Sequence, residues 1–230
     1  MTTWLISGAG RGIGLQLTRL VLARGDEALA GVRDPSSAAD LQALKAQHGA
    51  RLRLVALDVS DEASIAAARA EVGDRPVDVL VNNAGVIGPE RQSALDMDFA
   101  GFLRTLDVNT LGPLRLVQAF LPNLRAAGRA KIATLTSRMG SLSLAASDHA
   151  AYRASKAAAN KLMQALAADL APEGISVVAL HPGWVRTDMG GPAAEIGVEE
   201  SAAGLLKVID GLDAGSTGQF RDWRGEVLPW

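Results

Sequence analysis

Short apolar runs alternate along the chain with longer segments in which apolar residues recur at helical spacing. The runs expected to form strands span residues 4–7, 28–32, 52–57, 77–81, 132–135 and 175–180, with a last short strand at Phe220. Helices are expected over residues 12–24, 37–48, 98–124, 150–170 and 198–209, with a further helix that starts at Ser60. Alternation of this kind is typical of a parallel sheet with helices on both faces. The pattern therefore predicts an α/β fold, a doubly wound parallel sheet of about seven strands.

Capping and helix-breaking residues mark several of these boundaries. Ser60 is expected to be an N-cap, with the acidic Asp61 and Glu62 in the first turn, where the helix dipole favours negative charge. Pro113 is expected to kink the long helix 98–124, because proline lacks the N–H that a helix interior requires.

Composition narrows the class of protein. The chain has 230 residues, of which 48% are apolar, and we expect one domain over residues 1–230. A net charge of −2 offers no basic surface to nucleic acid. The chain has no cysteine and its three histidines lack ligand spacing, so neither a disulfide nor a metal site is expected. With no apolar run of membrane-spanning length and no basic leader, we expect a cytoplasmic protein.

A glycine-rich segment, residues 7–14, lies between the first expected strand and the first expected helix. Gly8, Gly12 and Gly14 give the spacing Gly-x-x-x-Gly-x-Gly. The common dinucleotide fingerprint differs, because Ile13 stands where its last glycine would fall. Glycines in such a turn let the backbone approach a pyrophosphate at a helix N-terminus. We therefore expect a nucleotide site and a Rossmann fold, with a purely structural turn as the alternative.

Residues just beyond the second expected strand bear on the choice of cofactor. An acid there would accept hydrogen bonds from a ribose 2′-hydroxyl, so Asp34 favours NAD. Asp34 precedes Pro35, however, and suits a turn, whereas Arg33 directly follows the strand residue Val32 and suits a 2′-phosphate. Arg11 in the glycine loop adds a second positive charge. We expect NADP, with NAD as the alternative; two ordinary surface arginines are the plainer interpretation.

Tyr152 and Lys156 lie four residues apart in an expected helix, which places them on one face. A free tyrosine has a pKa of about 10, and a neighbouring ammonium group lowers it toward a useful range for proton transfer. Tyr152 is the chain's only tyrosine. Ser137 follows the fifth expected strand at the sheet edge where such folds bind ligands. A solvated helix face and a turn serine are the alternative interpretations.

With these residues in place, the chain resembles the classical short-chain dehydrogenase/reductase family along nearly its whole length. The glycine loop matches that family's motif, with Ser7 in place of the usual threonine. The other matches, in chain order, are Asp58, Asn82-Asn83-Ala84-Gly85, Val108-Asn109, Ser137, Tyr152, Lys156, and Pro182-Gly183 with Thr187.

The resemblance implies a role for each matching residue. Tyr152 would exchange a proton with the substrate oxygen, and Lys156 would lower its pKa and hold the nicotinamide ribose. Ser137 would orient the substrate oxygen, Asn109 would support a water in a proton relay, and Arg33 matches the NADP-preferring branch. The residues implied to bind cofactor share the sheet edge: Gly8, Gly10, Arg11, Gly12, Ile13, Gly14, Arg33, Asp58, Val59, Asn83, Ala84, Gly85, Tyr152, Lys156, Pro182, Gly183, Val185 and Thr187.

Residues 181–191 and the ending 222–230 narrow the likeness to the C-factor and Sniffer-type carbonyl reductase group. This group implies compact NADPH-dependent enzymes that reduce carbonyls, often as homodimers, and it brings a signalling association; a tetramer is the alternative assembly. The glycine-rich segment 190–197 is expected to cover a small-molecule substrate. Candidate lining residues are Arg138, Met139, Ser143 and Trp184.

Three functions are therefore weighed. The first is an NADP-dependent carbonyl reductase, which the presence of all four matching residues, Asn109, Ser137, Tyr152 and Lys156, favours. The second is an NAD-dependent alcohol dehydrogenase, for which Asp34 speaks. The third is a cofactor-binding regulatory or signalling protein, which the retained Tyr152 and Lys156 oppose. A sugar-nucleotide epimerase would share the Tyr-Lys pair, but the chain is short for its added substrate region.

Overall fold

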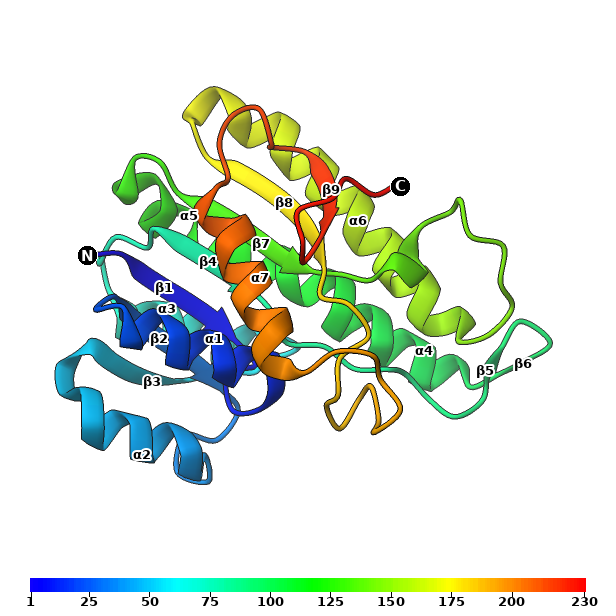
Figure 1. Cartoon of the computed structure of the whole chain (residues 1–230), viewed down its shortest axis with the longest axis horizontal. Coiled ribbons are helices and arrows are strands. Elements are labelled where there is room, and N and C mark those ends of the chain that lie inside the picture. Colours follow the sequence, from blue (N-terminus) through cyan, green and yellow to red (C-terminus); the bar gives the residue numbers. More distant parts are fainter.

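A computed structural model describes residues 1–230 and contains a central sheet of seven parallel strands (Figure 1). The strands lie in the order β3-β2-β1-β4-β7-β8-β9. Their bounds are β1 (Thr3–Ser7), β2 (Glu27–Val32), β3 (Leu52–Ala56), β4 (Val79–Asn82), β7 (Lys131–Leu135), β8 (Ser176–His181) and β9 (Gln219–Asp222). The order reverses direction at β1, as in doubly wound sheets. The predicted α/β Rossmann fold is confirmed.

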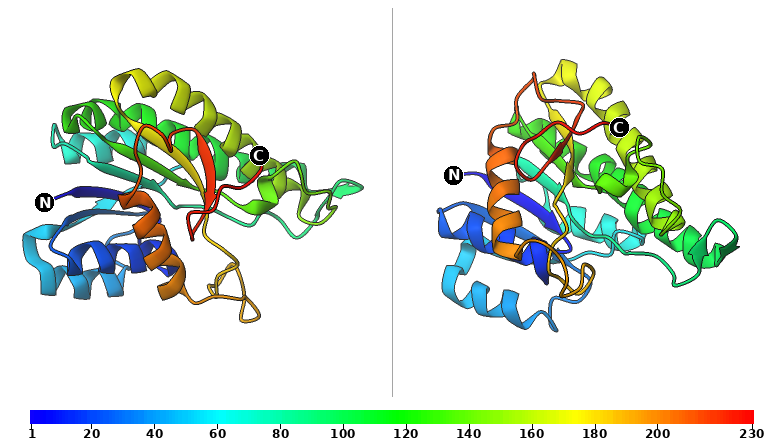
Figure 2. Two further views of the ribbon diagram at one scale, coloured as in Figure 1. Left: turned by 45° about the horizontal axis from the view of Figure 1, so that its top comes forward. Right: turned by 45° about the vertical axis from the view of Figure 1, so that its right-hand side comes forward.

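Helices cover both faces of this sheet (Figure 2). One face carries α1 (Gly12–Ala23), α2 (Ala39–His48) and α7 (Val198–Asp210). The other carries α3 (Glu62–Val72), α5 (Gly112–Ala127) and α6 (Ala150–Leu170). Because strand side chains alternate between faces, Trp4 and Ile6 of β1 enter the first core while Leu5 enters the second. Each such buried side chain stabilises the fold by about 1.5–3 kcal/mol.

The expected long helix is two helices joined by a wider turn. α4 (Phe99–Leu106) leads into the π-helical segment η2 (Asp107–Leu111), and α5 follows. An irregularity is present in this region, as predicted, but the prediction that Pro113 causes it was wrong. Pro113 lies in the first turn of α5, where the missing N–H costs nothing, and the irregularity precedes it. π-turns often occur at functional sites, and Asn109 lies within this one.

Two further details differ from the sequence-based expectation. The N-cap of α3 is Asp61, whose side chain accepts a hydrogen bond from the Ala63 N–H, while Ser60 bonds to Asp58 instead. A small hairpin, β5 (Gln92–Ser93) and β6 (Asp96–Met97), was not predicted, since two-residue strands carry no periodic signal. It projects from the body of the molecule (Figure 1).

The remaining short elements are three-residue 3₁₀ turns: η1 (Gly49–Arg51), η3 (Arg138–Gly140) and η4 (Ala171–Glu173). None of the helices has the length and apolar character that crossing a membrane requires.

Candidate active site

The glycine loop packs so closely that two of its glycines admit no side chain. Gly8 has a positive φ of 65°, and a Cβ there would lie 2.9 Å from the Cα of Ala84. A Cβ on Gly14 would collide with the Gly8 carbonyl and with Asn83 Nδ2. This loop is therefore fixed against the start of the segment that follows β4.

Asn83 and Ser7 hold that contact together. Asn83 Nδ2 donates to the carbonyl oxygens of Ser7 and Gly8, both at 2.9 Å. The Ser7 hydroxyl accepts from the backbone N–H groups of Asn83 and Ala84. The predicted Asn82–Gly85 motif thus holds the glycine loop in place through hydrogen bonds. The hydroxyl of Ser7, which stands in place of threonine, takes part in them.

The N-terminus of α1 suits an anion. Its N-cap residue Arg11 makes no capping hydrogen bond through its side chain, and the first turn holds no acid. The first N–H groups of a helix need acceptors and carry partial positive charge. Gly10 and Gly12 keep side chains away from this end. The residues present therefore fit the pyrophosphate of a dinucleotide.

Across the loop, Thr187 faces Gly12. A Cβ on Gly12 would lie 3.4 Å from Thr187 Cγ2. Thr187 Oγ1 accepts from the Gly190 N–H, and Val185 forms a bridge with Ile196, so this segment has its own internal support. The structure thus brings two distant parts of the predicted cofactor site together.

Asp34 and Arg33 follow β2, and they differ in whether their side chains already have partners within the chain. Asp34 Oδ1 accepts from the N–H and hydroxyl of Ser36, and these bonds lower the pKa of Asp34. Arg33 is exposed and near Asp58, whose pKa is lowered mainly by Ser60 hydrogen bonds and slightly by the Arg33 charge. Asp34 is committed to its turn, as its place before proline predicted.

Arg11 forms an ion pair with Asp188 at 2.5 Å, and both side chains are about three-quarters exposed. The pair joins the glycine loop to the segment after β8. Exposed pairs of this kind contribute at most about 1 kcal/mol. Val59, another predicted cofactor residue, is buried and packs beside Gly112.

Ser137, Tyr152 and Lys156 meet at the carboxyl end of β7. All three are buried, and the Ser137 hydroxyl interacts with the Tyr152 phenol. Lys156 Nζ donates to the Leu135 carbonyl at 2.9 Å and lies 5.7 Å from the centre of the Tyr152 ring. The i, i+4 spacing on α6 therefore places the pair together, as predicted.

Burial is the largest influence on the pKa values of Tyr152 and Lys156. It lowers the pKa of Lys156 from 10.5 to about 8. It raises the pKa of Tyr152, with partial compensation from the Ser137 hydroxyl. The expected lowering of the tyrosine pKa by Lys156 is therefore not what this structure shows. The physical reason is that the phenol is desolvated and the ammonium group bonds to Leu135 rather than to the phenol oxygen.

Asn109 sits beside this group, aimed inward by the π-turn. Its Oδ1 accepts from the Val86 N–H at 2.8 Å, and its Nδ2 donates to the Val86 carbonyl and to Ser155 Oγ. Gly85 allows the approach, since a Cβ there would lie 3.2 Å from Asn109 Oδ1 and 3.5 Å from Lys156 Nζ. In this structure Asn109 holds the segment after β4; its support of a water stays a prediction.

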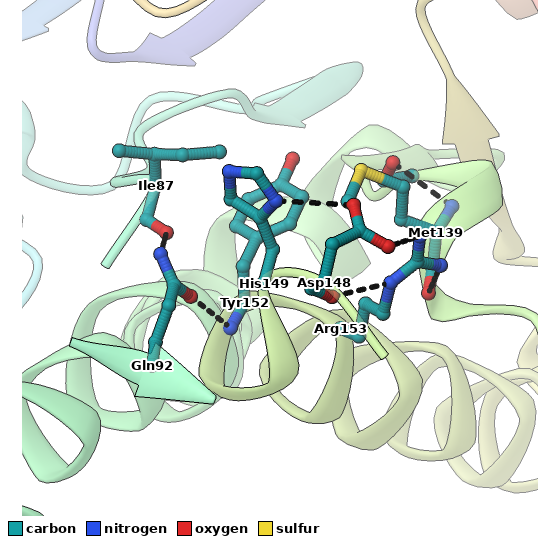
Figure 3. A network of polar contacts seen from close by, with 8 residues as sticks. Ile87, Gln92, Met139, Asp148, His149, Tyr152 and Arg153 are labelled. Carbon is teal, nitrogen blue, oxygen red and sulfur yellow. Dashed lines mark hydrogen bonds and ion pairs between the residues drawn. The ribbon is translucent and has the colours of Figure 1, made fainter. Parts of the chain in front are cut away.

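Two residues near Tyr152 were missed by the sequence analysis. Gln92 Oε1 accepts from the Tyr152 N–H at 3.1 Å, and His149 is the N-cap residue of α6, one turn earlier (Figure 3). Gln92 lies in a segment without periodicity, so no sequence signal marked it. Trp184, a predicted lining residue, donates from Nε1 to the Gly190 carbonyl and thereby braces its own loop. No group of three or more His, Cys, Asp or Glu side chains is placed to hold a metal ion.

Comparison with known proteins identifies the class. Residues 2–195 match the short chain dehydrogenase family model. The chain belongs to this family, which confirms the predicted NAD(P)-dependent oxidoreductase acting on CH–OH and C=O groups.

The narrower likeness is also confirmed. The chain is 50% identical over 157 residues to the C-signal protein of Myxococcus xanthus, covering 67% of this chain and 93% of that protein. It superposes on the NADPH-bound carbonyl reductase from chicken fatty liver with a TM-score of 0.94 at 36% identity, covering 100% and 99% of the two chains. For the carbonyl reductase Sniffer of D. melanogaster the TM-score is 0.93 at 31% identity, with both chains fully covered.

Proposed function

We propose that this protein is an NADP-dependent carbonyl reductase in which Tyr152 is the general acid. The observation that carries the proposal is the meeting of Ser137, Tyr152 and Lys156 at the carboxyl end of β7. Ligands of open α/β sheets bind at this edge, where the uncapped N-terminus of α1 also lies.

The residues divide the work of proton transfer. When bound, NADPH supplies the hydride. Ser137 orients the substrate oxygen, and Tyr152 gives it a proton through the phenol O–H. Burial raises the pKa of Tyr152, so the phenol holds its proton near neutral pH, which is the form that donates in a reduction. Lys156 holds the nicotinamide ribose and keeps positive charge beside the phenolate that forms.

Cofactor choice follows from the end of β2. Asp34 is occupied by Ser36, so it is a poor partner for a ribose 2′-hydroxyl. Arg33 is exposed there and can bind a 2′-phosphate, with Arg11 as a second cation. The chicken liver carbonyl reductase, similar over its full length, binds NADPH. We expect the remaining predicted cofactor residues to contact the nucleotide at the same edge of the sheet.

We also propose a homodimer, with the surface of α4 in its interface. Phe99 and Leu103 lie one turn apart on α4 and are 74% and 67% exposed, and Leu111 follows at 42%. An apolar row of this kind on a surface helix is typical of an interaction site. Sedimentation showing only monomer at micromolar concentration would overturn the dimer. A tetramer and a cytoplasmic location stay predictions.

The test follows NADPH absorbance with aldehydes, ketones, diketones and quinones, with Tyr152→Phe in parallel. We expect turnover by the wild type and loss in the variant of about a hundredfold or more. Turnover with NADH alone would favour the NAD-dependent dehydrogenase. Binding of NADPH without any turnover would favour a regulatory role, for which the 50% identity to the C-signal protein speaks.

A further inference from the structure

A cavity of about 370 Å³ opens between the segment after Gly85 and the start of α6. Six of the nine residues that line it carry a carboxylate, amide, hydroxyl or imidazole group, and Ile87 is its one large aliphatic side chain. Most sites for small molecules are mainly apolar. A cavity with six polar side chains at its edge can take a ligand that also carries hydrogen-bonding groups.

Gln92 ties this cavity to the candidate catalytic tyrosine (Figure 3). It is 7% exposed, and both ends of its amide are used. Oε1 accepts from the Tyr152 N–H and Nε2 donates to the Ile87 carbonyl, each at 3.1 Å. These two bonds therefore fix the position of the cavity wall relative to the first turn of α6. They also fix the orientation of the Gln92 amide.

His149 lies at the rim in an unusual backbone conformation. Its φ of 51° makes it the only residue other than glycine with positive φ in the chain. The left-handed region costs a side-chain-bearing residue about 1–2 kcal/mol. Asp148 holds the ring at 3.1 Å, and Arg153 holds Asp148 at 2.6 Å (Figure 3). Strain maintained by such a network is characteristic of ligand-binding positions.

Two side chains at this rim, His149 and Glu90, have hydrogen-bond acceptors left free, while the hydroxyls of Ser93 and Ser147 can both donate and accept. A carboxylate on Nδ1 of His149 selects the tautomer with its proton on Nδ1, which leaves Nε2 as an acceptor. Glu90 has no ion-pair partner, because the adjacent Arg91 pairs with Asp96. Arg153, a second cation near this rim, is likewise occupied, by Asp148.

We propose that this cavity binds the part of the substrate remote from its carbonyl, and that His149 and Glu90 select a hydrogen-bond donor there. The donor is a hydroxyl or a protonated amine, and a carboxylate in the same place is repelled. The inference rests on the proposed carbonyl reductase function and adds the substrate class to it.

Four para-substituted benzaldehydes test the idea, because they share one reacting group. The substituents are dimethylaminomethyl, hydroxymethyl, methyl and carboxylate. We expect kcat/KM with NADPH to fall in that order. Glu90→Gln should reduce the preference for the amine over the carboxylate by about fivefold. His149→Gly should reduce the preference for hydroxymethyl over methyl similarly, and glycine keeps the positive φ without strain.

Glu71→Gln is the matched control, since Glu71 is an exposed acid on α3 and does not line the cavity. It should leave every preference unchanged. Turnover of all four aldehydes at similar kcat/KM, or preferences that survive both cavity variants, would overturn the subsite and leave the reductase standing. Failure of the wild type to oxidise NADPH with any of them would contradict the proposed function itself, and the subsite with it.

Discussion

The half of the active site that faces the nucleotide and the half that faces the substrate are built by different means. Around the glycine loop, backbone meets backbone so closely that Gly8 and Gly14 admit no Cβ. Around Tyr152, long loops carry exposed side chains, among them Leu95 at 99% and Leu142 at 86%. Close backbone packing determines the conformation of the first region. The conformation of the second depends on individual polar contacts, such as those of Gln92 and Asp148.

This difference separates two kinds of change. A substitution in the close-packed region should disturb binding and stability together, because nothing there can shift cheaply. A substitution in the loop region should alter rate or selectivity and leave the fold intact. Four variants break or sharpen the contrast.

The largest effect is expected on the boundary between the regions, for Ser137→Ala. The Ser137 hydroxyl interacts with the Tyr152 phenol and, in the proposed reaction, with the substrate oxygen. Its loss should lower kcat by about a hundredfold, the usual effect of removing one hydrogen-bond donor from the reacting oxygen. Because Ser137 lowers the pKa of Tyr152, the alkaline limb of the pH–rate profile should move upward. NADPH affinity should stay the same.

Thr136→Val is the matched control for this variant. The Thr136 hydroxyl is buried one residue earlier and has no hydrogen-bond partner. Valine has nearly the same shape, so kcat should be almost unchanged. Equal losses in the two variants would show that β7 was disturbed as a whole.

Gly14→Ala tests the close-packed region. The added methyl group meets the backbone carbonyl of Gly8 and the Nδ2 of Asn83, which is held in place by its hydrogen bonds to the Ser7 and Gly8 carbonyls. We expect a destabilisation of about 1–3 kcal/mol, together with weaker NADPH binding. Urea unfolding and a fluorescence titration of NADPH measure the two effects.

Gly215→Ala supplies the comparison, because its Cβ would lie 3.4 Å from Asp213 Oδ1, an ordinary contact remote from the loop. It should change neither quantity appreciably. A Gly14→Ala protein with wild-type stability and affinity would refute the steric account of this region.

The same contrast explains what could be predicted from sequence. Strand and helix periodicity predicted the sheet, and the Gly8, Gly12 and Gly14 spacing predicted the loop, because both follow from local geometry. The i, i+4 rule placed Tyr152 and Lys156 together. The hairpin with Gln92 and the strained His149 carried no signal, since their positions depend on contacts between distant segments. The direction of the Tyr152 pKa depended on its burial, which spacing cannot reveal.

The next effect concerns stability against pH, measured by urea unfolding of the wild type and of Lys156→Met. Burial lowers the pKa of Lys156 from 10.5 to about 8, so above pH 8 the folded chain releases a proton that the unfolded chain retains. Stability therefore rises with pH in that window. Between pH 8 and 9.5 we expect a gain of roughly 1–2 kcal/mol from this group, which the variant should lack. Parallel curves for the two proteins would contradict the lowered pKa.

The smallest effect is expected for Arg33. Its side chain is exposed at the edge of the nucleotide site, so close packing does not constrain it. Its guanidinium is proposed to bind the 2′-phosphate, and solvent weakens such a contact. Arg33→Ala should therefore weaken NADPH binding by about tenfold and leave NADH binding nearly unchanged. Arg19→Ala, an exposed arginine of α1 that pairs with Asp40, is the control and should shift neither affinity. If Arg33→Ala weakened both cofactors equally, Arg33 would support the adenosine end as a whole, and the NADP preference would have to come from Arg11. For Arg11 the ion pair with Asp188 must first be broken, so Asp188→Asn would then tighten NADPH binding alone.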